Sequence, residues 1–260
     1  MNNKIVVYTT LVGKGYDNIS QPIVVDKNLD YICFVKKGEK RSQKNGIWTI
    51  EEIDYNLKDN IQLSRYPKLM PHKTCISLYD YSLYIDANVI IKDQYVYDRI
   101  YELANQGCPI AMVQHQHHDC VYQDAYICIA GCRASWFDVI RQVLFLKFKK
   151  FPKHYGLFEA NVIFRKHNDT KIKEFGELWW NTFMKFSKRD QLSQGYALRE
   201  SDVHPDLFLP NGFSTRNHYS FETVSHLPQK ETLSLKVKKN IVRFVLGTSR
   251  KILKEKPIQE

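Results

Sequence analysis

No stretch of about eighteen uncharged apolar residues occurs in this 260-residue sequence, so we expect no transmembrane helix. The first residues, MNNKIVVYTT, contain no cationic stretch followed by a long apolar run, and a secretory signal peptide is therefore not expected. Internal repeats and low-complexity linkers are also absent. Together these absences predict one cytoplasmic domain, and the length allows it a sizeable hydrophobic core.

A regular cysteine framework is lacking as well. The six cysteines are irregularly spaced and four of them lie in otherwise apolar stretches, which indicates reduced thiols rather than disulfides. A crowded group of histidines begins at His115, but its spacing to nearby cysteines does not match structural zinc sites. The cysteines are Cys33, Cys75, Cys108, Cys120, Cys128 and Cys132.

Charge is unevenly distributed. The formal net charge is +10, and the nine bases and three acids between Pro228 and Glu260 account for +6 of it, which leaves +4 for the rest. A body with so little excess charge does not favour a nucleic-acid partner. We therefore divide the chain into a domain at residues 1–224 and a basic tail at residues 225–260.

The tail interleaves apolar residues with lysine and arginine from Leu233 to Leu253, which predicts a basic amphipathic helix interrupted at Gly247. Such a helix can lie on an anionic membrane, and we expect a peripheral contact with the inner face of the plasma membrane. The alternative is that the tail packs on its own domain or on the partner in a homodimer.

Short apolar runs alternate with helical patterns, which is typical of an α/β domain with a largely parallel sheet. The longest helical pattern follows Asn168, the expected N-cap, and extends from about Asp169 to Phe186. A second helix is expected at residues 93–106. The expected strands cover residues 4–11, 30–35, 46–50, 81–85, 109–114 and 161–165.

One of these strands ends in the motif Tyr84-Ile85-Asp86-Ala87-Asn88. Ligands of α/β sheets bind beyond the carboxyl ends of strands, where the Asp86 carboxylate and the Asn88 amide oxygen would lie. Such oxygens suit a hard divalent cation, Mn²⁺ or Mg²⁺, that bridges a diphosphate. The alternative is a simple turn with local side-chain hydrogen bonds.

A basic stretch precedes this motif. Arg65 and Lys68 are three residues apart, so one helical turn would place both on one face, where they suit phosphate recognition. A solvated basic turn is the alternative reading.

In order and spacing, these pieces resemble the glycosyltransferase-like domain of the plant TOD/MUCI type, which also occurs in bacteria. Members of that family are similar to glycogenin-type transferases of the GT-A fold, a Rossmann-like, mostly parallel sheet flanked by helices. The resemblance covers roughly residues 4 to 200. The matching pieces are VYTTL at 7–11, GYD at 15–17, DYICF at 30–34, SRYPKLMPH at 64–72, YIDAN at 84–88, His115, DCVYQDA at 119–125, GLFE at 156–159, RKH at 165–167 and RDQLS at 189–193.

This resemblance implies a nucleotide pocket near Thr9, Thr10, Tyr16 and Asp17. The backbone of the first strand and either Tyr31 or Phe34 would flank the base. Arg65 and Lys68 would face phosphate or organise the loop formed by Asp86, Ala87 and Asn88. The two polar residues of that loop would hold the metal. GT-A enzymes often take a third metal ligand from a late histidine, which makes His218 a candidate here. A histidine with no role in metal binding is the alternative.

On the sugar side, the resemblance implies that Asp190 and Gln191 line the donor-sugar and acceptor pocket. Asp190 is the first choice for a sugar-binding or catalytic carboxylate, and Glu159 is the second. The alternatives are helix capping for Asp190 and a loop or cap position for Glu159. The acceptor would contact His115, Tyr122 and Asp124. The sequence departs from the family pattern at His118, where we expect arginine, and at Gln123, where we expect an acidic residue.

These inferences predict a metal-dependent glycosyltransferase of the hexosyltransferase class. Its donor would be a nucleotide-diphosphate sugar, with a UDP-sugar as the first candidate. Its acceptor would be a glycan or a lipid-linked sugar in the biosynthesis of a surface polysaccharide such as capsule or lipopolysaccharide. Neither inversion nor retention of the anomeric configuration follows from these residues. Two alternatives are a nucleotide-sugar hydrolase or pyrophosphorylase, and a non-catalytic protein that binds nucleotide sugars or acts as a membrane-associated scaffold.

Overall fold

The computed structural model describes residues 3–13, 19–39 and 44–224. Tyr16, Asp17 and the tail at 225–260 lie outside these ranges, so the expectations about them stay predictions. No helix in the described ranges is both long enough and apolar enough to span a bilayer.

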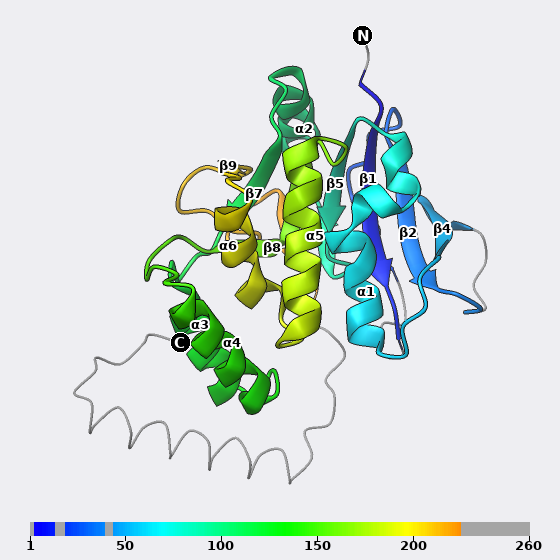
Figure 1. The fold of residues 1–260 in the computed structure, drawn as a ribbon. Helices are drawn as coiled ribbons and strands as arrows, with labels where there is room; N and C mark the ends of the chain where they lie inside the picture. Colours follow the sequence, from blue (N-terminus) through cyan, green and yellow to red (C-terminus); the bar gives the residue numbers. More distant parts are fainter. Residues whose placement is uncertain (1–2, 14–18, 40–43, 225–260) are drawn as a thin grey trace.

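A mixed, mostly parallel sheet forms the centre of the molecule (Figure 1). Its strand order is β3-β4-β2-β1-β5-β8-β7-β9, and β8 runs antiparallel to both of its neighbours. A separate antiparallel pair joins β10 to β6. The strands are β1 (Ile5–Leu11), β2 (Asp30–Lys36), β3 (Lys44–Asn45), β4 (Trp48–Ile53), β5 (Tyr81–Ile85), β6 (Val89–Ile91), β7 (Ile110–Gln114), β8 (Phe158–Arg165), β9 (Asp206–Leu207) and β10 (Phe221–Thr223).

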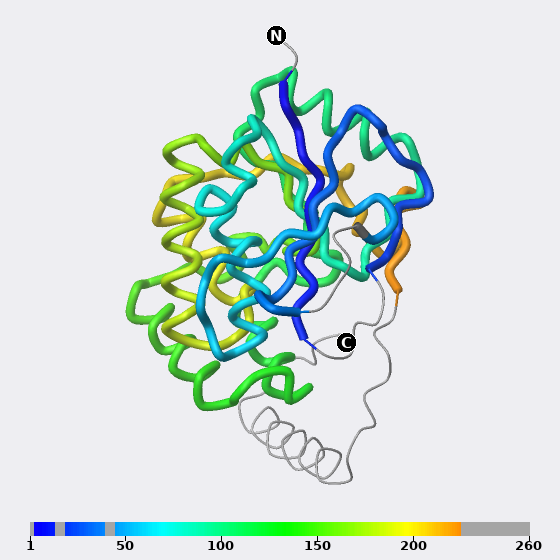
Figure 2. Tube along the Cα trace, turned by 90° about the vertical axis from the view of Figure 1, so that its right-hand side faces the viewer, coloured from blue at the N-terminus to red at the C-terminus, as the bar shows by residue number. Residues whose placement is uncertain are grey.

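Helices cover both faces of this sheet. The α-helices are α1 (Asn60–Leu69), α2 (Tyr95–Asn105), α3 (Val121–Ala130), α4 (Trp136–Phe148), α5 (Thr170–Lys185) and α6 (Asp190–Glu200), and the short 3₁₀ helices are η1 (Pro71–Lys73) and η2 (Cys75–Leu78). Turned by 90°, the molecule shows α1 and α5 on one side of the sheet and the β10 segment on the other (Figure 2). This layering is that of an α/β domain, as the sequence predicts.

The two faces of the sheet follow from alternation along the strands. Val7 and Ile5 of β1 pack in the core with α2, whereas Val6 and Tyr8 pack in the core with α1 and α5. All of β1 is buried, which explains why its first half, Ile5 to Tyr8, is a run of apolar and aromatic residues with no polar alternation. A third, smaller cluster joins α3, α4 and α6.

Helix α5 confirms the longest helical pattern, but its N-cap differs from the expected one. The carboxylate of Asp169 accepts hydrogen bonds from the backbone N–H groups of Lys171 and Ile172, whereas Asn168 donates to the backbone carbonyls of Ser77 and Tyr79. Asn168 therefore ties the start of α5 to the loop before β5, and the expectation that it caps the helix is wrong.

Candidate active site

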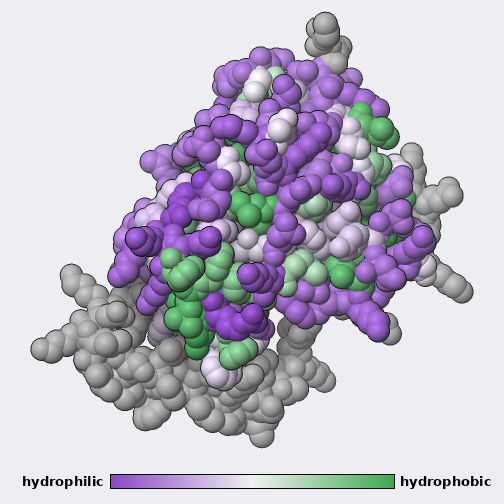
Figure 3. Space-filling view, in the orientation of Figure 1, coloured by the Kyte–Doolittle hydropathy of each residue, from purple (hydrophilic) through white to green (hydrophobic). Residues whose placement is uncertain are grey.

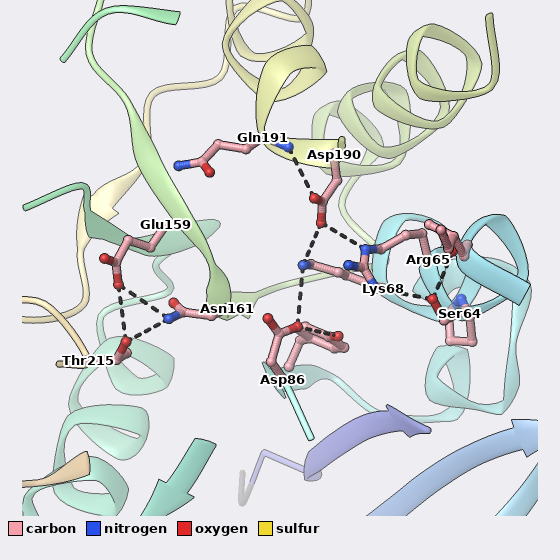
Figure 4. Close-up of polar contacts among 12 residues, drawn as sticks. Ser64, Arg65, Lys68, Asp86, Glu159, Asn161, Asp190, Gln191 and Thr215 are labelled. Carbon is pink, nitrogen blue, oxygen red and sulfur yellow. Dashed lines mark hydrogen bonds and ion pairs between the residues drawn. The ribbon is translucent and has the colours of Figure 1, made fainter. Parts of the chain in front are cut away.

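A polar cleft lies where β5 ends. Its volume is about 140 Å³. Because β8 runs antiparallel to β5, the first residues of β8 lie beside the residues that follow β5, and the backbone N–H of Asp86 donates to the carbonyl of Asn161. Helices α1 and α6 complete the cleft (Figure 4). The lining residues are Arg65, Lys68, Asp86, His115, Glu159, Ala160, Asn161, Arg189, Asp190, Gln191 and Arg216.

The centre of the cleft is a buried lysine between two carboxylates. The Lys68 ammonium donates to Asp190 Oδ2 at 2.6 Å and to Asp86 Oδ1 at 3.4 Å, and its side chain is only 2% exposed. Arg65 Nε lies 3.2 Å from the same Asp190 oxygen. Burial alone would raise the pKa of Asp190, but Lys68 and Arg65 outweigh it and hold that pKa well below its usual range. Asp190 is therefore ionised at neutral pH.

The backbone on both sides of this ion pair is fixed by buried donors. Arg165 donates to the carbonyl oxygen of Lys68 at 2.7 Å and to the Tyr8 hydroxyl at 2.9 Å. The Trp179 indole N–H donates to the carbonyl oxygen of Asp190 at 2.7 Å. Side chains from β8, β1 and α5 thus hold the two charged residues in place.

Asp86 is the most exposed of the three carboxylates. The Tyr84 hydroxyl donates to Asp86 Oδ1 at 2.7 Å, the oxygen that Lys68 also approaches. Within the described ranges, Asp86 Oδ2 has no hydrogen-bond or ion-pair partner, and the side chain is 31% exposed. This oxygen is therefore available to a ligand.

The expected third metal ligand lies elsewhere. In the β10–β6 pair, Thr223 lies opposite Val89 and Phe221 opposite Ile91, so His218 lies toward the end of β6 that is remote from Asn88. The His218 ring is buried and stacks on Tyr219, with ring centroids 4.5 Å apart. The structure does not bring His218 to the cleft, because the register of this pair places it beyond the other end of β6.

The available ligands nevertheless suit a magnesium or manganese ion that shares its coordination with substrate. In the described part of the chain, no three histidine, cysteine, aspartate or glutamate side chains gather as a metal site. Asn88 does not line the cleft; its amide N–H donates to the carbonyl of Val224, a bond that does not use its amide oxygen. One carboxylate, substrate phosphates and water are a common ligand set for Mg²⁺, and Asp86 Oδ2 fits it.

Glu159 lines the cleft, but its oxygens are already bonded. Thr215 donates to Oε2 at 3.1 Å, Asn161 donates to the same oxygen at 3.3 Å, and Arg216 donates to Oε1 at 2.8 Å. This pattern links β8 to the segment before β10. These hydrogen bonds suit Glu159 to hold Arg216 in position rather than to transfer a proton.

Two further cations complete the cleft. Arg189 and Arg216 line it, although sequence reasoning gave neither a role. The signal for Arg189 was its place directly before Asp190, whereas only the fold brings Arg216 to the cleft. Burial, with His118 and Arg216 nearby, lowers the pKa of His115 to about 4, so His115 adds no charge at neutral pH.

Other predicted site residues lie outside the cleft. The Tyr31 hydroxyl is bonded to Tyr97 and to the backbone of Asp26, and the Tyr122 hydroxyl donates to the carbonyl of Phe151. Asp124 is buried beside Cys128, and burial raises its pKa. None of the three lines the cleft, because each side chain is used in packing or in a hydrogen bond elsewhere.

Thr9 and Thr10 on β1 are buried and also lie outside the cleft lining. Their hydroxyls have no hydrogen-bond partner within the described ranges. Ala87 is partly buried against the core that contains α2. Of the predicted residues, the structure gathers Arg65, Lys68, Asp86, His115, Glu159, Asp190 and Gln191 around one cleft.

The fold and the cleft define an α/β protein with a cation-rich site at the carboxyl end of a central strand. Comparison with known proteins gives the family: the chain belongs to the TOD1/MUCI70, glycosyltransferase-like domain family, whose sequence model matches residues 1–217. This match includes every residue that lines the cleft, and membership supports a glycosyltransferase that acts on a sugar donor and an acceptor.

Among solved structures, the chain is similar to the apo structure of WbbM, a bifunctional glycosyltransferase. The sequence identity is 13% and the TM-score is 0.46, and the similarity covers 94% of this chain and 45% of the other. The chain thus spans less than half the length of WbbM. No curated protein matches the chain at a significant level.

Proposed function

We propose that this protein transfers a hexose from a nucleotide-diphosphate sugar to an acceptor hydroxyl. A UDP-sugar is the first candidate for the donor. The observation that carries the proposal is the charge balance of the cleft. Four cationic side chains, Arg65, Lys68, Arg189 and Arg216, face three carboxylates there. The resulting excess of positive charge favours an anionic ligand, and a diphosphate offers several oxygens to arginine donors at once.

In this proposal Asp86 Oδ2 and the Asn88 amide oxygen hold a divalent cation, Mn²⁺ or Mg²⁺. When bound, the ion would neutralise charge on the diphosphate as it leaves. Lys68 is enclosed by carboxylates and would act mainly by fixing Asp86 and Asp190. Arg65, Arg189 and Arg216 would then contact the phosphates.

Asp190 and Gln191 are proposed to bind the sugar hydroxyls. Asp190 is ionised and its Oδ1 already accepts the backbone N–H of Gln191 at 3.2 Å, so it is suited to accept a hydrogen bond rather than to donate a proton. The Gln191 amide donates to the carbonyl of Phe158 at 3.3 Å, which directs this side chain across the cleft toward β8.

The acceptor in this proposal is a glycan or lipid-linked sugar of a surface polysaccharide. Support for this part comes from the alternation of basic and apolar residues in the tail, outside the described ranges. His115 is the one expected acceptor residue that lines the cleft. We therefore assign the acceptor side to the wall that His115 and Glu159 share.

The first experiment is thermal denaturation with UDP-, GDP-, CMP- and dTDP-sugars, each with Mn²⁺, with Mg²⁺ and with a chelator. We expect one donor class to raise the melting temperature only when metal is present. The Asp86→Asn variant should lose this metal-dependent shift. Asp98→Asn is the matched control, because Asp98 is exposed on α2 and bonds only to Gln94 among the described residues.

Product analysis with and without acceptor separates transfer from hydrolysis. A nucleotide-sugar hydrolase or pyrophosphorylase would release its products equally well in both conditions. The proposal fails if no donor gives a metal-dependent shift, or if Asp86→Asn keeps the full shift.

A further inference from the structure

Helix α4 exposes a continuous apolar surface. Of the thirteen large apolar side chains that are exposed in the described ranges, five lie on this one helix. Scattered exposed apolar residues need no explanation, but a cluster of this kind marks an interaction surface. Figure 3 shows it as a green patch over the α3–α4 region. The five residues are Trp136, Phe137, Ile140, Leu144 and Phe148.

The geometry of the helix points this surface away from the protein. At 100° per residue, the five side chains form a stripe about 120° wide. Val139, Gln142 and Leu146 are buried on the opposite side. The Gln142 amide donates to Ser193 of α6 at 2.9 Å, and its oxygen accepts from Ser187. The inner face is thus fixed by buried contacts, and the helix does not need the outer face in order to fold.

Basic side chains surround the apolar stripe. Between residues 133 and 153 the chain carries six exposed lysines and arginines and one acidic residue, Asp138, which pairs with Arg141. By the same helical geometry, Arg141 lies at one edge of the stripe and Lys147 lies just inside the opposite edge, which Trp136 forms. The six bases are Arg133, Arg141, Lys147, Lys149, Lys150 and Lys153.

We propose that the outer face of α4 is a membrane-docking surface that binds the headgroup region of an anionic lipid bilayer. Apolar side chains with aromatic residues, flanked by lysine and arginine, are the composition of helices that lie in the membrane interface. Each cation near an anionic surface adds to binding, and the apolar stripe adds the burial that a soluble anion would not provide.

Charge disfavours the other occupants of this surface. A second copy that used the same face would bring two basic rims together, and like charges repel at close range. The tail at 225–260 carries a net charge of +6, so it is not the electrostatic complement of a basic rim. An anionic bilayer complements both the stripe and its rim.

The position of α4 is consistent with an enzyme that acts on a membrane-bound substrate. Figure 1 places α3 and α4 at the end of the molecule toward which β1 and β2 run. Strand β5 runs parallel to β1, so the cleft that includes Asp86, directly after β5, lies toward the same end. Helix α6, to which α4 is bonded, begins at Asp190 of the cleft. Docking through α4 would therefore hold the cleft near the bilayer surface.

Sedimentation of the full chain with vesicles tests this proposal. One vesicle preparation contains phosphatidylcholine alone, and the other contains equal parts of phosphatidylcholine and phosphatidylglycerol. We expect binding to the anionic vesicles only, and we expect salt to weaken it. The double variant Leu144→Ser/Phe148→Ser should bind at least about tenfold more weakly, since it removes two apolar side chains from the exposed stripe that docking would bury.

Two further variants serve as comparison. Lys147→Glu/Lys150→Glu should also bind anionic vesicles more weakly than the unmodified chain. Leu78→Ser should not, because Leu78 is equally exposed but lies in η2, just before the start of β5. Circular dichroism checks that each variant is folded, and each should keep the donor-induced thermal shift, which separates this proposal from the proposed function.

Intrinsic fluorescence gives a direct reading of the docked helix. Of the four tryptophans, Trp48, Trp179 and Trp180 are buried and Trp136 is 55% exposed, so a blue shift on vesicle addition would report Trp136. Trp136→Phe should abolish that shift. Unchanged vesicle binding by the Leu144→Ser/Phe148→Ser variant would overturn the proposal. An absence of any vesicle binding by the unmodified chain would overturn it as well. So would light scattering showing that the Leu144→Ser/Phe148→Ser variant loses self-association while its vesicle binding is unchanged, because the stripe would then be a contact between two copies of the chain.

Discussion

Replacing Asp190 with asparagine tests whether the buried ion pair is arranged as described. The substitution keeps the size of the side chain and removes its charge. Lys68 would then keep Asp86 as its only carboxylate partner among the described residues, at 3.4 Å, while its side chain stays 2% exposed. An ammonium that is buried with too little compensating charge is costly.

Removal of one partner from a buried ion pair typically costs 3 to 5 kcal/mol. Because Asp86 remains, we expect the lower end, about 3 kcal/mol of lost unfolding free energy at pH 7. In a chain of this length that corresponds to a fall in melting temperature of about 6 to 12 °C. The matched control is Asp202→Asn, whose ion pair with Lys171 is exposed on both sides, so its loss should cost far less.

Urea denaturation followed by circular dichroism measures both costs. The folded-state pKa of Asp190 lies below its unfolded value of about 3.9, so its stabilisation is complete above that value and is lost as the pH falls toward the folded-state pKa. The difference between Asp190→Asn and the unmodified chain should therefore shrink below about pH 4. Equal costs for Asp190→Asn and Asp202→Asn at pH 7 would refute the argument.

Two other predictions concern packing and titration. A Cβ atom added at Gly176 of α5 would lie 2.7 Å from the backbone oxygen of Leu69, so Gly176→Ala should destabilise the fold by about 1 to 3 kcal/mol in urea denaturation. Gly195→Ala in α6 should cost less, because its nearest neighbour is a phenylalanine ring that can shift, at 3.2 Å. The His115 imidazole should titrate near pH 4 in an NMR experiment, and a midpoint close to the usual value of about 6.5 would contradict its burial beside the cleft.

Local patterns were sufficient for much of the fold. The buried strand before Asp86 and the helical turn that carries Arg65 and Lys68 depend on residues close together in the sequence. The long helix α5 also follows from the regular spacing of its apolar residues, although the observed N-cap, Asp169, is one residue after the predicted one. Periodicity finds such elements because each element buries one side of a locally regular backbone.

Local sequence patterns could not predict the orientation of the Lys68 side chain. Its spacing to Arg65 suggested a cation directed at phosphate, but its ammonium lies against the carboxylate of Asp190, which is 122 residues away in the sequence. The ion-pair partner of Glu159 is Arg216, from a segment that no local pattern connects to β8. Contacts between such distant residues depend on strand order, which the sequence pattern does not encode locally.

The sequence by itself determined that the chain forms an α/β domain, that a strand ends at Asp86, and that this motif lies among cationic residues typical of a glycosyltransferase-like family. Only the tertiary structure decided which side chains meet at that strand end. The antiparallel direction of β8 brings Glu159 and Asn161 beside Asp86, and the register of β10 with β6 keeps His218 away. Strand direction and register arise from packing of the whole chain, because each pairing must satisfy buried backbone groups and both apolar faces of the sheet at once.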